Sequence, residues 1–332
     1  MDILERLKTA SERLRETAQT VDAGSEPPLH HLKMLAEIGY FDVTTEARPG
    51  LRRRMLDLIS SGCGVTAFLA TQHEGVCRRL HQAGHPMTKK ARKGERWYGV
   101  CFAHLRRTPS PVEAIRSRRQ VLYSGTGPWF SGLGVFSEVL VGGATEDGRF
   151  LMGLASVASP EIAVQKLPEL AVMNATATVG LHFNALCVPS EDVVVDITPE
   201  ELNEKDMHST VFQAARSLGA ARAASRFMKD ELREDMEQGL EGLHCQLDAW
   251  DESPNWVDAT ALRQKALKLA GSAIETAFVQ VGGKAHVKDH PLHRIAREAS
   301  FYYTTQLTAP LRSAVTDDLR RGLEQISKVL TK

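Results

Sequence analysis

Residues 97–197 restrict the fold more than any other part of the chain, because they carry β-rich runs with no helical pattern between them. The runs are "WYGVCFAHL", "RQVLYSGTGPWFSG", "SEVLVGGATEDGRFLMGLASV" and "ATVGLHFNALCVPSEDVVV". Gly, Pro and the dipeptide Asp147-Gly148 separate them and are turn signals. Parallel strands of an α/β fold are joined by long crossovers, usually helices, whereas antiparallel strands need only a turn. The pattern therefore predicts a compact antiparallel β domain over residues 97–197.

On both sides of this segment, apolar residues recur at helical spacing. Ile3, Leu7 and Leu14 fall on one face near the N-terminus. From Pro199 onward the chain is rich in Ala and amphipathic, which allows helix axes to approach closely. One apolar stripe there comprises Ala266, Leu269, Ala270, Ile274, Ala277, Phe278 and Val281. We therefore predict a mostly helical α+β fold with an N-terminal helical domain (1–96), a central antiparallel β domain (97–197) and a C-terminal four-helix-bundle-like domain (198–332).

Charge and cysteine usage exclude several classes of protein. Lys+Arg and Asp+Glu both number 41, so no global charge favours nucleic acid or an anionic membrane as a partner. The short basic clusters "LRRRM" (51–55) and "KKARK" (89–93) are typical of solvent-facing helix or loop surfaces. The five cysteines form no C-x-x-C pair, and the N-terminus has no apolar run of a signal peptide. No segment has the apolar length of a membrane span, so we expect a cytoplasmic protein.

Four segments together resemble the acyl-CoA dehydrogenase superfamily of flavoproteins, and they occur in the order found in that family. They are "SGCGVTAFLATQHEGV" (61–76), "GPWFSGLG" (127–134), "MNATATVGLHFNALCVPSEDVV" (173–194) and "QVGGKAHVKDHPLHRIAREA" (280–299). The resemblance covers most of the chain, although the chain is short for the family. It implies the same helical, β and helical order that the patterns above predict.

The resemblance also implies a cofactor and residues that hold it. It predicts FAD, with Trp129 beside the flavin ring and Ser131 hydrogen-bonded to that ring. It places Gly282 and Gly283 near the cofactor's phosphates, in the family across a subunit interface, so we expect a homodimer or a homotetramer. The substrate implied is an acyl thioester of CoA or of a carrier protein.

Two of the family's cofactor-contacting motifs have no counterpart in this sequence. The loop "AHLRRTPSP" (103–111) replaces one of them and contains His104, Arg106 and Arg107. Arginine is well suited to binding a pyrophosphate or the phosphates of a CoA or carrier-protein arm, so we predict substrate contacts here. A solvated loop is the alternative. The second missing motif is a turn in the C-terminal bundle.

Gln306 occupies the position of the family's catalytic Glu when residues are counted from Arg297. In the family this carboxylate removes the α-proton of the thioester, which a neutral amide cannot do. Gln is nearly isosteric with Glu and can still orient a substrate by hydrogen bonds. The candidate carboxylates to replace the base are Glu204, Asp206 and Glu298, although each is also typical of an ordinary helix surface.

Three histidines have a spacing that is also found in metal sites. His286, His290 and His293 follow an H-x3-H-x2-H pattern. The family has no metal in this segment, so we predict none.

The sequence leaves three functions open. The first is an FAD-dependent oxidoreductase acting on an acyl thioester, with activity altered by Gln306. The second is a flavin-dependent monooxygenase on the same fold, because O₂ activation at reduced flavin needs no α-proton base. The third is a catalytically silent relative that acts as a binding or assembly partner, which the loss of the base and of two cofactor motifs would fit.

Overall fold

The computed structural model describes residues 2–24 and 27–330, and these group into two compact units. The first unit holds the residues up to Arg48 together with Gly62–Asn203. The second holds Pro49–Ser61 and the residues from Glu204 onward. The predicted order of helical, β and helical segments along the chain is confirmed.

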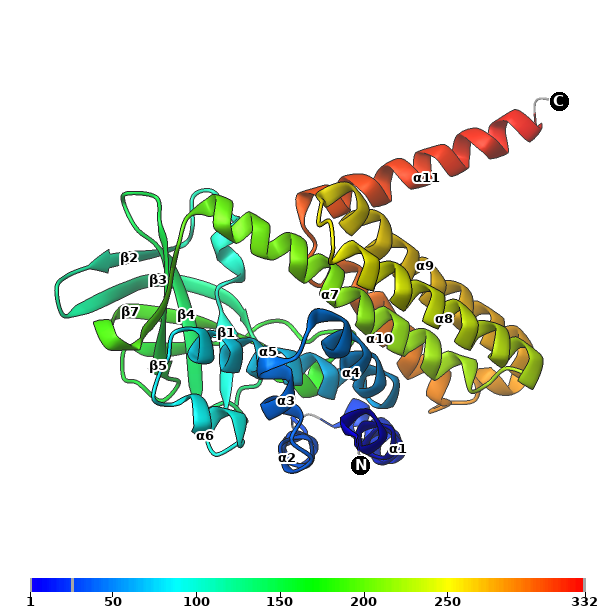
Figure 1. Ribbon diagram of the computed structural model, residues 1–332, viewed down its shortest axis with the longest axis horizontal. Helices are drawn as coiled ribbons and strands as arrows, with labels where there is room; N and C mark the ends of the chain where they lie inside the picture. Colours follow the sequence, from blue (N-terminus) through cyan, green and yellow to red (C-terminus); the bar gives the residue numbers. More distant parts are fainter. Residues whose placement is uncertain (1, 25–26, 331–332) are drawn as a thin grey trace. The chain divides into compact units, whose positions relative to one another are not determined.

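The helices of the first unit form around buried apolar faces. They are α1 (Ile3–Ala23), α2 (Leu29–Glu37), α3 (Tyr40–Glu46), α5 (Gly64–Gln82) and α6 (Thr88–Arg92). Leu7 and Leu14 of α1 are fully buried, as expected for residues seven positions apart, which lie on one face of a helix. Helix α5 packs against α3 and strand β1 (Tyr98–Cys101), so it joins the helical part of this unit to its sheet (Figure 1).

The sheet of the first unit has eight strands. After β1 they are β2 (Val112–Arg116), β3 (Gln120–Phe130), β4 (Glu138–Ala144), β5 (Phe150–Ser156), β6 (Ile162–Gln165), β7 (Val179–Pro189) and β8 (Val193–Ile197). Their spatial order is β6-β7-β3-β2-β4-β5-β8, and β1 pairs with β4.

The sheet is mixed, which corrects the prediction of a purely antiparallel domain. Strand β1 runs parallel to β4, and β2 meets β4 in parallel at Glu113 and Ala144. All other neighbours are antiparallel. The β2–β3 hairpin lies between β1 and β4 in the chain and supplies the long connection that a parallel pair requires. The sequence pattern did not predict the parallel pair, because its connection contains no α-helix.

The second unit has helices and no strand among its described residues. It contains α8 (Asp230–Trp250), α9 (Trp256–Val281), α10 (Pro291–Thr304), α11 (Ala309–Leu330), most of α4 (Pro49–Gly62) and most of α7 (Pro199–Ser225). Helix α9 packs against α8, α10 and α11, and Figure 1 shows α8 and α9 running side by side. The apolar stripe predicted for α9 is largely buried, including Ala266, Ala270 and Ala277.

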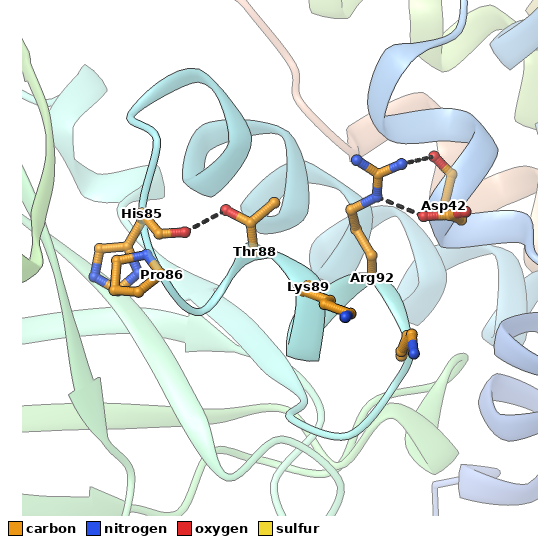
Figure 2. Close-up of a pocket in the computed structure, with 7 residues that line it drawn as sticks. Asp42, His85, Pro86, Thr88, Lys89 and Arg92 are labelled. Carbon is orange, nitrogen blue, oxygen red and sulfur yellow. Dashed lines mark hydrogen bonds and ion pairs between the residues drawn. The ribbon is translucent and has the colours of Figure 1, made fainter.

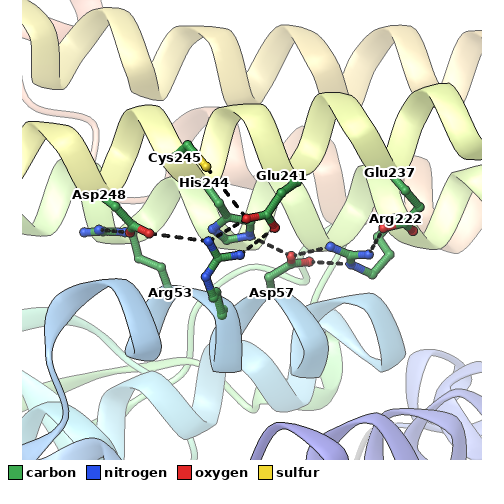
Figure 3. Close-up of polar contacts among 9 residues, drawn as sticks. Arg53, Asp57, Arg222, Glu237, Glu241, His244, Cys245 and Asp248 are labelled. Atoms are coloured by element: carbon green, nitrogen blue, oxygen red, sulfur yellow. Dashed lines mark hydrogen bonds and ion pairs between the residues drawn. The ribbon is translucent and has the colours of Figure 1, made fainter.

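Helix α4 belongs to the bundle because its polar side chains meet α7 and α8 (Figure 3). Arg53 is 2% exposed and binds Asp248 at 2.7 Å and Asp251 at 2.6 Å. The interpretation of "LRRRM" as a solvent-facing cluster is therefore wrong for Arg53. Residues 49–61 group with the C-terminal helices although they precede the β segment, while the three predicted domain boundaries stay predictions.

A buried carboxylate completes the contact between α4 and the other bundle helices. Asp57 is 2% exposed and accepts hydrogen bonds from Arg222 on α7, at 2.9 and 3.1 Å, and from His244 on α8 at 2.9 Å. Burial alone would raise the pKa of this carboxyl, but Arg222 and His244 outweigh that effect and keep the pKa below its ordinary value. Asp57 is therefore an ionised partner shared by three helices.

In the described part of the chain, no helix combines the length and the apolar character that a bilayer span needs.

Candidate functional site

Trp129 stands at the end of β3 in a conformation that a bulky residue rarely adopts. Its φ is 66°, in the left-handed region, and the side chain is 50% exposed while the next residue, Phe130, is fully buried. The pairing of β3 with β7 shifts register between Gly127 and Phe130, so a local irregularity directs the indole outward. Strain of this kind costs about 1–3 kcal/mol and gathers at functional sites. An exposed indole face offers a flat apolar surface for stacking.

Ser131 lies just beyond this strand and forms part of a chain of hydroxyl groups. Its Oγ is 2.7 Å from Thr178 Oγ1, which is 2.7 Å from Thr176 Oγ1, and Thr176 donates to the carbonyl of Met173 at 2.7 Å. Ser131 itself is only 4% exposed. The two threonines were not singled out by the sequence reasoning, because only the folded β3 and the turn before β7 bring them to Ser131.

His104 is buried beneath β3, whereas the arginines beside it reach the surface. The imidazole is 1% exposed, and its Nε2–H donates to the carbonyl of Gly142 at 2.8 Å. Burial lowers the pKa of His104, with Arg107 and Arg106 adding to the effect, so the ring is neutral. Arg107 is exposed and Arg106 half-buried. The substrate contacts expected of the three residues stay predictions, and the burial of His104 makes the arginines the better candidates.

Gly127 shows how closely His104 approaches the strand that carries Trp129. A Cβ atom at this glycine would lie 2.4 Å from Cys101 Sγ and 3.1 Å from His104 Cε1. Glycine is thus required at this point of β3, two residues before the exposed indole. His104, in the segment between β1 and β2, packs against this strand.

Gln306, in the second unit, follows α10 and is also strained. Its φ is 51°, the side chain is half-buried, and its amide Oε1 accepts a hydrogen bond from Ser209 Oγ on α7 at 2.8 Å. This bond uses one lone pair of the amide oxygen and leaves both amide N–H groups for a ligand. Ser209 was missed by the sequence reasoning, because 97 positions separate the two residues.

The three carboxylates that were considered as replacement bases differ in their burial and their partners. Glu298 is 2% exposed and its Oε1 lies 2.7 Å from Arg294, so it is held in an ion pair. Glu204 is exposed to solvent. Asp206 is 8% exposed and lies three residues before Ser209, hence on the same face of α7 as the residue that holds Gln306. Of the three carboxylates, Asp206 is therefore the one on the helix face that also contacts Gln306 through Ser209.

The glycine pair after α9 has open space around it. Gly282 has φ 66° and ψ −150°, which only glycine adopts at low cost. Within the described residues, no atom lies within 4 Å of a Cβ built on Gly282 or Gly283. The described chain therefore has room for a side chain at Gly283. The close approach of a group from outside the chain to this backbone would explain why the residue is glycine.

The basic residues Lys89, Arg92 and Lys93 of the first unit border a surface pocket of about 510 Å³. Figure 2 shows Arg92 held by Asp42, with Lys89 nearby and the Thr88 hydroxyl bonded to the carbonyl of His85. None of the predicted site residues lines this pocket. The exposed Lys89 agrees with the interpretation of "KKARK" as a solvent-facing cluster.

The predicted site residues are divided between the two units. His104, Arg106, Arg107, Trp129 and Ser131 lie in the first, and Gly282, Gly283 and Gln306 lie in the second. Of the histidines at 286, 290 and 293, His286 ends the short turn η4 (Gly282–His286) and His293 lies in α10, with their rings 6.2 Å apart. Over residues 2–24 and 27–330, no group of three or more His, Cys, Asp or Glu side chains is placed to hold a metal ion.

No protein-family model and no curated protein matches this sequence. Solved structures do match its fold. Glutaryl-CoA dehydrogenase from Mycobacterium smegmatis has a TM-score of 0.80 at 14% identity, covering 95% of this chain and 94% of its own. KijD3 in complex with FMN and dTDP-3-amino-2,3,6-trideoxy-4-keto-3-methyl-D-glucose has a TM-score of 0.76 at 17% identity, covering 96% and 92%.

A nitrososynthase from Micromonospora carbonacea var. africana is a third such structure. Its TM-score is 0.75 at 15% identity, with 96% of this chain and 95% of the other covered. Identities this low establish the fold alone. The chain therefore has the acyl-CoA dehydrogenase fold over nearly its whole length, which confirms the resemblance and the fold class predicted from the sequence.

Proposed function

We propose that this chain, which has the acyl-CoA dehydrogenase fold, is a flavin-dependent oxidoreductase that binds FAD and acts on an acyl thioester. The observation that carries the proposal is Trp129, a half-exposed indole held in left-handed backbone at the end of β3. Solved structures with this fold include one determined with FMN, which supports a flavin as the ligand of that surface. An exposed, strained aromatic residue beside Ser131 fits a flat heteroaromatic ring.

When bound, the flavin supplies the capacity to accept a hydride. The chain's own residues hold the cofactor and the substrate. The indole of Trp129 covers one side of the ring, and the Ser131 hydroxyl bonds its edge. Gly282 and Gly283 let phosphates approach the backbone of a second subunit, so the protein acts as a homodimer or homotetramer. The open space around both glycines supports this assignment.

The substrate is an acyl thioester of CoA or of a carrier protein. Arg107 and Arg106 provide charge for its phosphates, as guanidinium groups bind phosphate in bidentate fashion. Gln306 donates from its amide N–H groups, because Ser209 occupies the amide oxygen. A donor in this place can hold a carbonyl oxygen but cannot take an α-proton. Asp206, on the same face of α7 as Ser209, is the substitute base of the proposed reaction, and without a carboxylate at position 306 the wild type should be a poor acyl-CoA dehydrogenase.

Titration with FAD tests this proposal. Wild-type protein should bind FAD saturably at micromolar concentrations, and Trp129→Ala should weaken that binding by about 10-fold or more, as expected for loss of a buried stacking contact. Tyr303→Ala is the matched control, because Tyr303 is an aromatic residue with 40% exposure in the second unit. Equal affinities for wild type and Trp129→Ala would refute the role of Trp129.

A flavin-dependent monooxygenase is the second candidate, and Gln306 favours it. Such a reaction needs no α-proton base, so an amide at this position does not slow it. KijD3, which has the same fold, was determined in complex with a dTDP-linked sugar, which supports a ligand range of this fold wider than acyl thioesters. Reduced, flavin-loaded protein that consumes O₂ and transfers oxygen to a substrate, without dehydrogenating acyl-CoA, would decide for this candidate. A protein that binds no flavin would instead be the catalytically silent relative.

A further inference from the structure

We propose that the hydroxyl chain of Ser131, Thr178 and Thr176 makes Ser131 a hydrogen-bond acceptor toward the bound ring and so favours the reduced flavin. This inference rests on the proposed function, because it concerns the flavin held beside Trp129. It assigns a positioning role to Thr176 and Thr178, which do not themselves face the ring in the proposal.

The direction of the hydrogen bonds along this hydroxyl chain follows from the number of protons that each hydroxyl carries. Each hydroxyl has one proton to donate. Thr176 donates its proton to the Met173 carbonyl, which has none to give in return. Thr176 must therefore accept from Thr178, at 2.7 Å, and Thr178 must accept from Ser131, also at 2.7 Å.

Ser131 is left with oxygen lone pairs and no free proton. Among the residues that the structure describes, no donor is recorded at Ser131 Oγ besides the shared contact with Thr178. Ser131 as a whole is only 4% exposed, so few water molecules can compete for its hydroxyl. A ligand atom that reaches this oxygen is consequently bound best when it carries a hydrogen.

The backbone around the two threonines is strained, and such strain is typical of functional sites. Met173 and Ala177 flank the short η2 turn (Asn174–Thr176), and both have left-handed φ values, 62° and 44°. The turn is held to the end of β3 by a 2.6 Å hydrogen bond from Gly132 N–H to the Thr176 carbonyl. With Trp129, three of the six non-glycine residues recorded with positive φ lie around this hydroxyl chain.

The two redox states of a flavin present different edges to such an acceptor. Reduction adds two electrons to the ring, and a ring nitrogen that only accepted hydrogen bonds gains a proton and becomes a donor. A hydroxyl fixed as an acceptor therefore bonds the reduced ring and leaves the oxidised nitrogen without a donor. The protein should bind reduced flavin more tightly than a freely rotating hydroxyl would allow.

The test measures the midpoint potential of the bound flavin, together with the affinities of its oxidised and reduced forms. Thr178→Val removes the acceptor of the Ser131 proton, so Ser131 can rotate and donate to the oxidised ring. The ratio of reduced to oxidised affinity should fall about fivefold, the effect of one net hydrogen bond, which lowers a two-electron potential by about 20 mV. Thr176→Val interrupts the chain one step further away and should shift the potential in the same direction.

Two controls separate the polarity of Ser131 from a general disturbance of the sheet. Thr178→Ser restores the hydroxyl and should keep the wild-type potential. Thr126→Val removes a hydroxyl of the same strand as Trp129, one that bonds His182 at 2.9 Å outside the chain, and should change nothing.

The outcomes distinguish this inference from the function on which it rests. Wild-type protein that binds no flavin overturns both. Wild-type protein that binds flavin, with potentials in Thr178→Val and Thr176→Val that are unchanged or raised, overturns the hydroxyl-chain proposal alone. A lower potential in both valine variants, with Thr178→Ser at the wild-type value, supports it.

Discussion

Mild acid should destabilise the first unit through His73. This residue is completely buried in α5, its Nε2–H donates to the Ala91 carbonyl at 2.9 Å, and its Nδ1 accepts from Tyr98 N–H at 3.0 Å. The contact with Tyr98 N–H requires the neutral ring, because a protonated Nδ1 cannot accept a hydrogen bond. The indole of Trp97 lies beside it, with ring centroids 4.7 Å apart. Burial lowers the pKa of His73 from 6.5 to about 4.

The sign and size of the effect follow from proton uptake. Between pH 6.5 and 4 the unfolded chain binds a proton at His73 and the folded chain does not, so the free energy of unfolding falls as the pH falls. From the two pKa values, the loss between pH 7 and pH 5 is about 2 kcal/mol. His31, whose pKa burial also lowers to about 4, should add a similar loss.

Urea unfolding followed by tryptophan fluorescence measures this loss, because Trp97 reports on the surroundings of His73. His73→Gln, which cannot titrate, should lower stability at pH 7 but lose about 2 kcal/mol less than wild type between pH 7 and pH 5. The comparison with wild type cancels the contributions of carboxylates, which are common to both. Equal pH dependence in the two proteins would refute the account of His73.

Three further substitutions test other parts of the structure. Asp57→Ala leaves the buried His244 and the half-buried Arg222 without their shared carboxylate, and thermal or urea unfolding should show a loss of about 3–5 kcal/mol; a loss below 1 kcal/mol would contradict the ionised network. Gln306→Glu should raise acyl-CoA dehydrogenation with an artificial electron acceptor by up to about 10²–10⁴-fold in flavin-loaded protein, and a wild type that already turns over at ordinary enzymatic rates would show that another residue is a competent base. Gly283→Ala should weaken FAD binding without lowering the melting temperature, because a Cβ there meets nothing in the described chain; unchanged FAD affinity would count against phosphate binding at this loop.

The sequence was sufficient for the features that depend on local periodicity. The spacing of Leu7 and Leu14 predicted a buried face, and both side chains are fully buried. The Ala-rich stripe of α9 was predicted on the same grounds. The β-rich runs of 97–197 were placed correctly as a sheet. Each of these inferences needs only residues within a few turns or one strand.

Features that depend on distant contacts could not be predicted in this way. Thr178 meets Ser131 across 47 positions and Ser209 meets Gln306 across 97, so neither pair leaves a local signal. The parallel pairing of β1 with β4 depends on a hairpin acting as the crossover. Arg53 looked like a surface residue because its partners Asp248 and Asp251 lie 195 and 198 positions away.

The visible absorption spectrum of the purified protein, before and after addition of FAD, tests the central claim most directly. We expect a flavin band that stays with the protein through gel filtration at about one FAD per chain, and that is lost or reduced in Trp129→Ala. A wild-type protein that retains no flavin band after incubation with FAD or FMN would contradict the claim that this chain is a flavoenzyme.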